Sequence, residues 1–287
     1  MADLQRAARA VAEEGLGAWL FLNQFHKDPI ADRILGIPVE RHNTRPWLYL
    51  LPARGGPVKL VHAIEAGLLD HLPGERRVYG SREQFVTALR ELASSLSQPG
   101  AAMVGCDFSA ELPAVSYLDH GAALLLESCG FHLRSSAALV QRVLGTLGPE
   151  GIASHERAAV HLYAIVAEVW GRIRDRLREG RRLGEGEVQG WMLSAFDQRG
   201  LETDSAPVVA VGPHSADPHY EPQADGALLE SGAVLQLDLW AKERGPEGVY
   251  ADISWVGYLG PSVPAEVKRA FAAVRDARDL AVAFIAE

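Results

Sequence analysis

The sequence has little cysteine and no long apolar segment. Its 287 residues include only two cysteines, Cys106 and Cys129, in unrelated surroundings and without the spacing of a zinc site. A disulfide framework is therefore not indicated, and we expect both to be buried thiols in a reducing compartment. No run of about 18 apolar residues occurs, and the N-terminus lacks the apolar core of a signal peptide. The sequence thus favours a cytoplasmic protein with no membrane partner.

Basic residues are also scarce relative to acidic ones. The chain carries 28 Lys and Arg against 37 Asp and Glu, which gives a formal net charge of −9. This excess of negative charge argues against a nucleic-acid partner. The main concentration of basic residues comprises Arg172, Arg174, Arg176, Arg178, Arg181 and Arg182. Because acidic residues are interleaved with these arginines at a predicted helix end, we interpret the cluster as a solvated helix face.

The sequence also lacks a candidate nucleophile and a glycine-rich nucleotide-binding loop. No serine lies in a nucleophile elbow, and neither cysteine has a plausible base nearby in the sequence. The glycines of the N-terminal half do not have phosphate-binding spacing. The sequence therefore offers no candidate for nucleophilic catalysis.

A turn-rich segment, Gly-Thr-Leu-Gly-Pro-Glu-Gly, divides the chain into two predicted domains, residues 1–150 and 151–287. In the first, apolar strands alternate with helical patterns, which predicts a small layered α/β domain. The second begins with a long helix that Ser154 is expected to cap. A shorter helix over 185–199 and a strand over 208–211 follow.

The second domain contains a hairpin signal. Segments 234–240 and 249–256 show strand-like alternation and flank a loop rich in turn formers. Asp238 lies in the first segment and Asp252 in the second, and the simplest register lets them approach each other across the hairpin. Two close carboxylates must share a proton or bind a cation, and neither strand carries a basic partner. We therefore predict a hard or borderline divalent ion at this position.

Three segments carry a family resemblance: VGPHSADPHYEP, LDLWA and GVYADISWVGYLG. They resemble the metallopeptidase family that includes methionine aminopeptidase, aminopeptidase P, prolidase and creatinase, which share the pita-bread fold. The Xaa-Pro aminopeptidase and dipeptidase branch is the most similar. Residues 1–150 resemble the N-terminal domain of the aminopeptidase P and creatinase branch. The implied fold class is α/β, a creatinase-like domain followed by a pita-bread domain.

The resemblance also implies an activity and a site. Asp238 and Asp252 match the first two metal ligands, with Asp252 bridging two divalent ions (Mn, Co or Zn). His219, in the PHY element, matches a residue that contacts substrate and helps to stabilise the tetrahedral intermediate. The implied reaction is hydrolysis near the N-terminus of a peptide with a free amino group, through a water that two metal ions activate. A homodimer is the implied assembly.

The C-terminal end departs from the family pattern. Members of the family complete the site with one His and two Glu residues from later strands. After Asp252 this sequence has no His, and its only Glu residues are Glu266 and Glu287. Residues 264–287 show helical periodicity and no stop signal. We therefore expect the chain to end inside the catalytic domain, to bind metal poorly and to be inactive alone.

Two other functions stay open. One is a non-catalytic peptide-binding or scaffold protein with the same fold, and the other is a creatinase-like amidinohydrolase, which the two aspartates disfavour. His214 remains undecided, whereas Tyr220 is interpreted as a support of the loop that carries the PHY element. His26, with Asp28 and Asp32, is interpreted as a loop with ordinary surface pairing.

Overall fold

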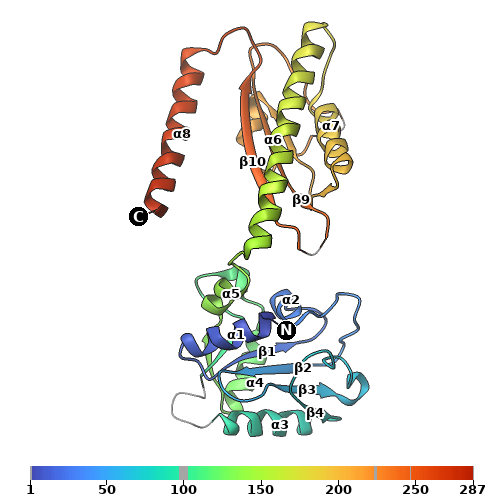
Figure 1. The fold of residues 1–287 in the computed structure, drawn as a ribbon, viewed down its shortest axis with the longest axis vertical. Helices are drawn as coiled ribbons and strands as arrows, with labels where there is room; N and C mark the ends of the chain where they lie inside the picture. Colours follow the sequence, from blue (N-terminus) through green and yellow to red (C-terminus); the bar gives the residue numbers. More distant parts are fainter. Residues whose placement is uncertain (1, 97–102, 223–224, 246, 287) are drawn as a thin grey trace. The chain divides into compact units, whose positions relative to one another are not determined.

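The structure is a computed structural model that describes residues 2–96, 103–222, 225–245 and 247–286. The chain divides into two compact units, Met1–Thr146 and Leu147–Glu287, which we name the N-terminal and C-terminal domains (Figure 1). No described helix is long and apolar enough to cross a membrane.

The N-terminal domain has a six-stranded sheet with helices on both faces. Its elements are α1 (Ala2–Glu13), β1 (Ala18–Asn23), α2 (Pro29–Leu35), β2 (Trp47–Pro52), β3 (Val58–His62), η1 (Ala63–Glu65), β4 (Glu75–Tyr79), α3 (Arg82–Ser95), β5 (Met103–Cys106), η2 (Pro113–Val115), α4 (His120–Ser128), β6 (His132–Ser135) and α5 (Ala137–Val143). The strand order is β4-β3-β2-β1-β5-β6. Strand β1 is antiparallel to β2 and parallel to β5, so the sheet is mixed.

Alternate residues of the central strands fill two separate cores. Trp19 and Phe21 of β1 pack with α1, α2 and α5, whereas Ala18 and Leu20 of the same strand pack with α3 and α4. A strand with apolar side chains on both faces is typical of a sheet between two helical layers. Cys106 lies in the second core, and both cysteines are free and buried, as the sequence analysis predicted.

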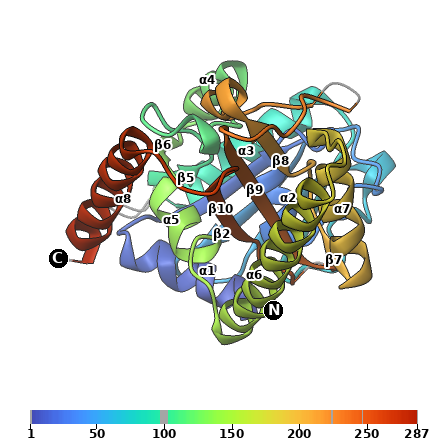
Figure 2. The ribbon, with the colours of Figure 1, turned by 90° about the horizontal axis from the view of Figure 1, so that it is seen from above.

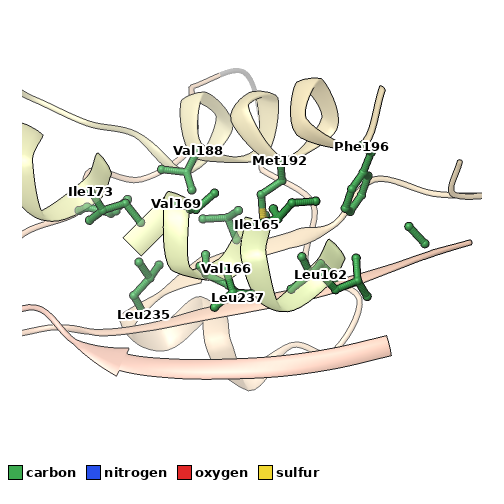
Figure 3. Packing of buried hydrophobic residues seen from close by; sticks show 14 of the residues in the cluster. Leu162, Ile165, Val166, Val169, Ile173, Val188, Met192, Phe196, Leu235 and Leu237 are labelled. Carbon is green, nitrogen blue, oxygen red and sulfur yellow. The ribbon is translucent and has the colours of Figure 1, made fainter. Parts of the chain in front are cut away.

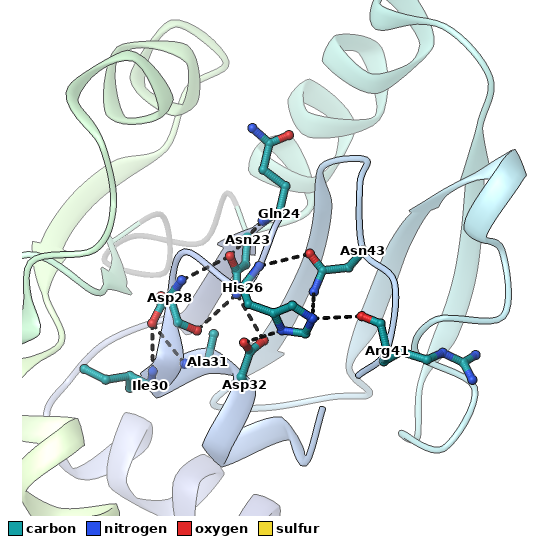
Figure 4. A network of polar contacts seen from close by, with 9 residues as sticks. All are labelled: Asn23, Gln24, His26, Asp28, Ile30, Ala31, Asp32, Arg41 and Asn43. Atoms are coloured by element: carbon teal, nitrogen blue, oxygen red, sulfur yellow. Dashed lines mark hydrogen bonds and ion pairs between the residues drawn. The ribbon is translucent and has the colours of Figure 1, made fainter. Parts of the chain in front are cut away.

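The polar cluster around His26 was predicted to be ordinary pairing on the surface, but its two aspartates are buried. Asp28 and Asp32 are only 4% and 7% exposed. His26 Nδ1 lies 2.7 Å from Asp32 Oδ2, and the Asn23 amide donates to Asp32 Oδ1 over 3.1 Å (Figure 4). The prediction was wrong because Asp28 caps the N-terminus of α2 by accepting the backbone N–H groups of residues 30 and 31. The cap holds the carboxylate of Asp28, and the contacts with Asn23 and His26 hold that of Asp32.

The C-terminal domain consists of a small antiparallel sheet with helices packed on one face. Its elements are α6 (Pro149–Arg178), α7 (Glu185–Gln198), β7 (Leu201–Glu202), β8 (Val208–Val211), η3 (Gly212–Ala216), β9 (Val234–Glu243), β10 (Ala251–Tyr258) and α8 (Ala265–Ala286). Strand β9 is central, with β10 along one edge and β7 and β8 along the other.

Helices α6 and α7 cover one face of this sheet (Figures 2 and 3). Leu235, Leu237 and Leu239 of β9 are fully buried against apolar side chains such as Ile165 of α6 and Met192 of α7. Because side chains alternate along a strand, residues 236, 238 and 240 point to the opposite face. The leucines therefore fix which face of the sheet the polar residues of β9 occupy.

Two predicted boundaries require correction. Helix α6 begins at Pro149 after Gly148, so Ser154 lies inside the helix and does not cap it. A proline at the first helical position is already in a helical conformation and gives up no needed hydrogen bond. The Ser154 hydroxyl instead donates to Glu243 Oε2 over 2.9 Å. The second hairpin strand begins at Ala251, not at residue 249, and β9 continues to Glu243.

Helix α8 occupies the predicted final helical segment but has no buried residue. Its largest apolar side chains are highly exposed, with Phe284 at 78% and Ile285 at 82%. An apolar stripe of this kind ordinarily faces another surface. The helix thus presents an uncovered apolar surface.

Gly257 in β10 packs directly against the indole of Trp170. A Cβ placed on Gly257 would lie 2.7 Å from Trp170 Cζ2, which is too close for van der Waals contact. We expect Gly257→Ala to destabilise the C-terminal domain by about 1–3 kcal/mol through overpacking. Gly190→Ala is the matched control, since its Cβ would meet nothing within 4 Å in α7 and alanine favours a helix. Urea unfolding of both variants measures the difference, and equal midpoints would contradict the expectation.

Candidate metal centre

Asp238 and Asp252 lie on the same face of the β9–β10 hairpin. Asp238 is directly opposite Ser254, and Asp252 is directly opposite Trp240. The two aspartates are therefore diagonal neighbours, whose Cα atoms lie roughly 7–8 Å apart in antiparallel pairs. Their face is the one opposite α6 and α7. The register thus brings the two predicted ligands together.

The electrostatics of the pair follow from this arrangement. Partial burial, followed by the negative charge of Asp238, raises the pKa of Asp252 above its usual value. The Ser254 hydroxyl donates a hydrogen bond to Asp238 Oδ1 and orients that carboxylate. A cation placed between the carboxylates would relieve their mutual repulsion. These two residues are consequently suited to bind a divalent ion.

A third carboxylate near the hairpin is already engaged. Asp204 Oδ1 accepts a 2.7 Å hydrogen bond from the indole N–H of Trp240, and this bond lowers the pKa of Asp204. Within the described residues, no group of three or more His, Cys, Asp or Glu side chains is arranged to hold a metal ion. The centre that the structure describes therefore offers two oxygen donors, Asp238 and Asp252, which fit a divalent cation only in part.

His219 lies in the loop that follows β8 and η3. Its backbone N–H donates to Asp217 Oδ1 over 2.9 Å, and its residue is exposed. Among the described contacts, no hydrogen bond or ion pair joins the imidazole to Asp238 or Asp252. The structure thus brings the two aspartates together and leaves the His219 side chain free.

A single buried carboxylate holds both ends of this loop. Glu185, the first residue of α7, is completely buried. Its Oε1 accepts from the backbone N–H of Val211 (2.8 Å) and lies 2.9 Å from His214 Nδ1. Its Oε2 accepts from the Tyr220 hydroxyl and from the backbone N–H of Ala227, each over 2.7 Å. Glu185 therefore connects the start, the middle and the end of the segment that contains His219.

The charge of Glu185 is maintained by these contacts. Burial alone would raise the pKa of Glu185, but the hydrogen bonds from His214, Val211 and Tyr220 outweigh it and lower the pKa. Burial and the bond to Glu185 raise the pKa of Tyr220 to about 12, so its hydroxyl remains a donor at neutral pH. The rings of Tyr220 and His214 also stack, with centroids 4.2 Å apart.

The sequence analysis did not identify Glu185. The residue follows Gly184 at the predicted start of a helix, where an acid is ordinarily explained by the helix dipole. Nothing in its spacing links it to residues 211–227, because Val211 and Ala227 are 26 and 42 residues away in the chain and become its neighbours only in the folded domain. His214, which the sequence left undecided, is a partner of this carboxylate, and Tyr220 supports the loop as predicted.

One family model matches most of the C-terminal domain. Residues 157–287 match metallopeptidase family M24. No curated protein matches the sequence.

Several solved structures share the fold over most of the chain. The dipeptidase PepE from Mycobacterium ulcerans is 19% identical, with a TM-score of 0.65 over 95% of this chain and 67% of its own. The prolidase from Pyrococcus horikoshii OT3 is 17% identical, with a TM-score of 0.58 over 98% and 72%. The X-prolyl aminopeptidase from Caenorhabditis elegans, described as a cytosolic enzyme with a di-nuclear active site, is 14% identical (TM-score 0.58, 92% and 42%). At these identities the likeness establishes the fold, which is the predicted creatinase-like and pita-bread arrangement.

Proposed function

We propose that Asp238 and Asp252 are metal ligands of a peptidase of the Xaa-Pro aminopeptidase or dipeptidase type, and the match of residues 157–287 to metallopeptidase family M24 supports this proposal. The observation that carries the proposal is the position of the two carboxylates on one face of the β9–β10 hairpin. The names of the similar structures, which include dipeptidases, prolidases and X-Pro aminopeptidases, support the substrate class.

Each residue has a distinct role in this proposal. Bound divalent ions supply Lewis-acid chemistry to peptide hydrolysis. Asp238, oriented by Ser254, and Asp252 hold them, with manganese, cobalt and zinc as the candidates. His219, whose ring is exposed, hydrogen-bonds the peptide or the developing oxyanion. The substrate is a peptide with a free N-terminus, and the working assembly is a cytoplasmic homodimer.

The chain by itself should bind metal weakly. Two carboxylates bring two negative charges to a pair of divalent ions and leave most coordination positions to water. No third His, Cys, Asp or Glu joins them in the part of the chain that the structure describes. We accordingly expect no peptide turnover by this chain alone.

Manganese titration tests the assignment of the ligands. We expect a weak site whose affinity falls at least about tenfold in Asp238→Asn and in Asp252→Asn, since losing even a hydrogen-bond partner of a metal ligand costs 10–100-fold. Electron paramagnetic resonance of free manganese reports the bound fraction directly. Hydrolysis of an Xaa-Pro dipeptide, assayed in parallel, is expected to stay at background.

Asp197→Asn is the matched control, because this acid is exposed on α7 and pairs with Arg244. It removes the same charge from the other side of the sheet and should leave manganese binding unchanged. If all three variants bind alike, the two aspartates are not ligands. A dissociation constant as tight as that of a complete site, together with turnover, would show that the chain supplies ligands beyond the two aspartates.

The limited ligand set favours one alternative, a peptide-binding or scaffold protein that uses the same fold without chemistry. Such a protein would bind an Xaa-Pro peptide equally well with manganese and with a chelator present. The peptidase proposal requires Asp252→Asn to weaken the manganese-dependent part of peptide binding. Calorimetric titration with an Xaa-Pro peptide, in manganese and in chelator, distinguishes the scaffold from the peptidase.

A further inference from the structure

A pocket of about 890 Å³ lies in the C-terminal domain between the end of α6 and the segment after β10. Both segments lie at the same end of this domain in Figure 1. Asp238, Asp252 and His219 do not line it. The pocket is therefore separate from the candidate metal centre, and its volume is within the range of small-molecule sites.

The floor of the pocket is apolar. Ile173, Leu183, Leu229 and Leu259 line it and are each at least 94% buried. The half-buried ring of Tyr258 also lines it. Aliphatic side chains offer no partners for the N–H and C=O groups of a peptide backbone, which are costly to bury unpaired. The floor consequently suits a hydrocarbon chain better than a peptide.

The rim of the pocket is strongly basic. Arg174, Arg178, Arg181 and Arg182 line it, whereas Glu230 is the one acidic residue of the lining in the described part of the chain. These four arginines belong to the cluster that the sequence analysis interpreted as a solvated helix face.

The structure divides the arginine cluster into two sets. Arg172 stacks 3.8 Å from the centre of the Trp191 ring, and Arg176 forms an ion pair with Glu187, so these two arginines face α7. Arg178 and Arg182, in contrast, make no hydrogen bond or ion pair with any described residue. A helix C-terminus can explain Arg178 through the helix dipole, but Arg182 lies beyond the last turn of α6.

We propose that this pocket binds an amphipathic anion, a small molecule with one apolar chain and a carboxylate or phosphate head group. The hydrocarbon chain occupies the leucine and isoleucine floor. The head group reaches the guanidinium groups of Arg178 and Arg182, whose planar donors match carboxylate and phosphate oxygens. The site is independent of metal binding, so it stands or falls separately from the proposed peptidase function.

Calorimetric titration of the full chain with dodecanoate and with dodecyl phosphate, below their micelle concentrations, tests the proposal. We expect saturable binding of at least one of them, and the preferred anion identifies the head group. Dodecyltrimethylammonium, which has the same chain and a positive head, should not bind. Because each buried CH₂ contributes about 0.8 kcal/mol, decanoate should bind about tenfold more weakly than dodecanoate where the carboxylate is accepted.

The double variant R178Q/R182Q is expected to weaken anion binding at least tenfold. Both side chains are exposed and unpaired, so folding is unaffected. R172Q/R176Q removes the same charge from the side of α6 that faces α7, and it should keep the wild-type affinity. Equal loss in both double variants, equal binding of the ammonium compound, or no binding of either anion would overturn the proposal.

Discussion

Glu185→Ala is expected to lower the free energy of unfolding of the C-terminal domain by about 4 kcal/mol. The substitution removes the acceptor of two backbone N–H groups, that of the buried Val211 and that of the part-buried Ala227. Each unsatisfied buried donor costs about 1–3 kcal/mol, and a cavity adds to this. His214 and Tyr220 can turn toward water and recover part of their hydrogen bonding. Urea unfolding of the full chain measures the loss.

A second measurement separates loop anchoring from general destabilisation. Hydrogen exchange of residues 212–222 should accelerate in Glu185→Ala before the rest of the domain is affected, because the loop loses its central acceptor. Glu185→Gln keeps the volume and one acceptor oxygen, and it should lie between wild type and alanine. Glu187→Ala, two residues further along the same helix, removes only a partly exposed ion pair with Arg176 and should cost less than about 1 kcal/mol. If Glu185→Ala and Glu187→Ala behave alike, Glu185 does not anchor the loop.

The N-terminal domain should lose stability as the pH rises from about 4 to about 8. Burial, followed by the charge of Asp107 and a hydrogen bond with it, raises the pKa of Asp28 to about 8. Burial also raises the pKa of Asp107, whose Oδ2 has no donor among the described residues. A protonated Asp28 can supply that donor, so the folded state holds a proton that the unfolded chain releases near pH 4. The free energy of unfolding therefore falls by up to about 1.4 kcal/mol per pH unit over this range.

Asp28→Asn should remove most of this pH dependence. The amide oxygen can still accept the N–H groups of Ile30 and Ala31, and its NH₂ group can donate to Asp107 as the protonated acid does. At pH 7 we expect a gain of up to about 4 kcal/mol, the work of keeping Asp28 protonated there. Asp119→Asn is the matched control, since Asp119 also caps a helix, α4, but is exposed. Urea unfolding curves at several pH values give the free energy of unfolding as a function of pH. If Asp28→Asn shows the same dependence on pH as the wild type, Asp28 and Asp107 do not share a proton.

The sequence predicted those features that depend on local periodicity. An unbroken apolar run marks β8 and alternating apolar residues mark β9, and the register between β9 and β10 follows once Leu235, Leu237 and Leu239 face the helices. The approach of Asp238 and Asp252 could therefore be predicted from residues alone, because side chains on one face of paired strands become neighbours.

Features that depend on burial were not predictable in the same way. The buried carboxylates of Asp28 and Glu185 appear in the sequence as ordinary polar residues near turns, and their partners are distant in the chain or arise from capping geometry. The arginine cluster was interpreted as one solvated helix face, but the structure divides it between Trp191 of α7 and the pocket. The burial of these carboxylates and the division of the arginines depend on contacts between residues that are distant in the chain.

The four contacts of Glu185 have a consequence for how the loop can change. One side chain closes a ring between Val211 and Ala227, in the way that a crosslink would. The two anchored ends make the loop a place where recognition residues can be exchanged. Exposed positions that do not contact Glu185 and carry no proposed role, such as Ala216 and Glu221, can be substituted while Val211 and Ala227 stay fixed.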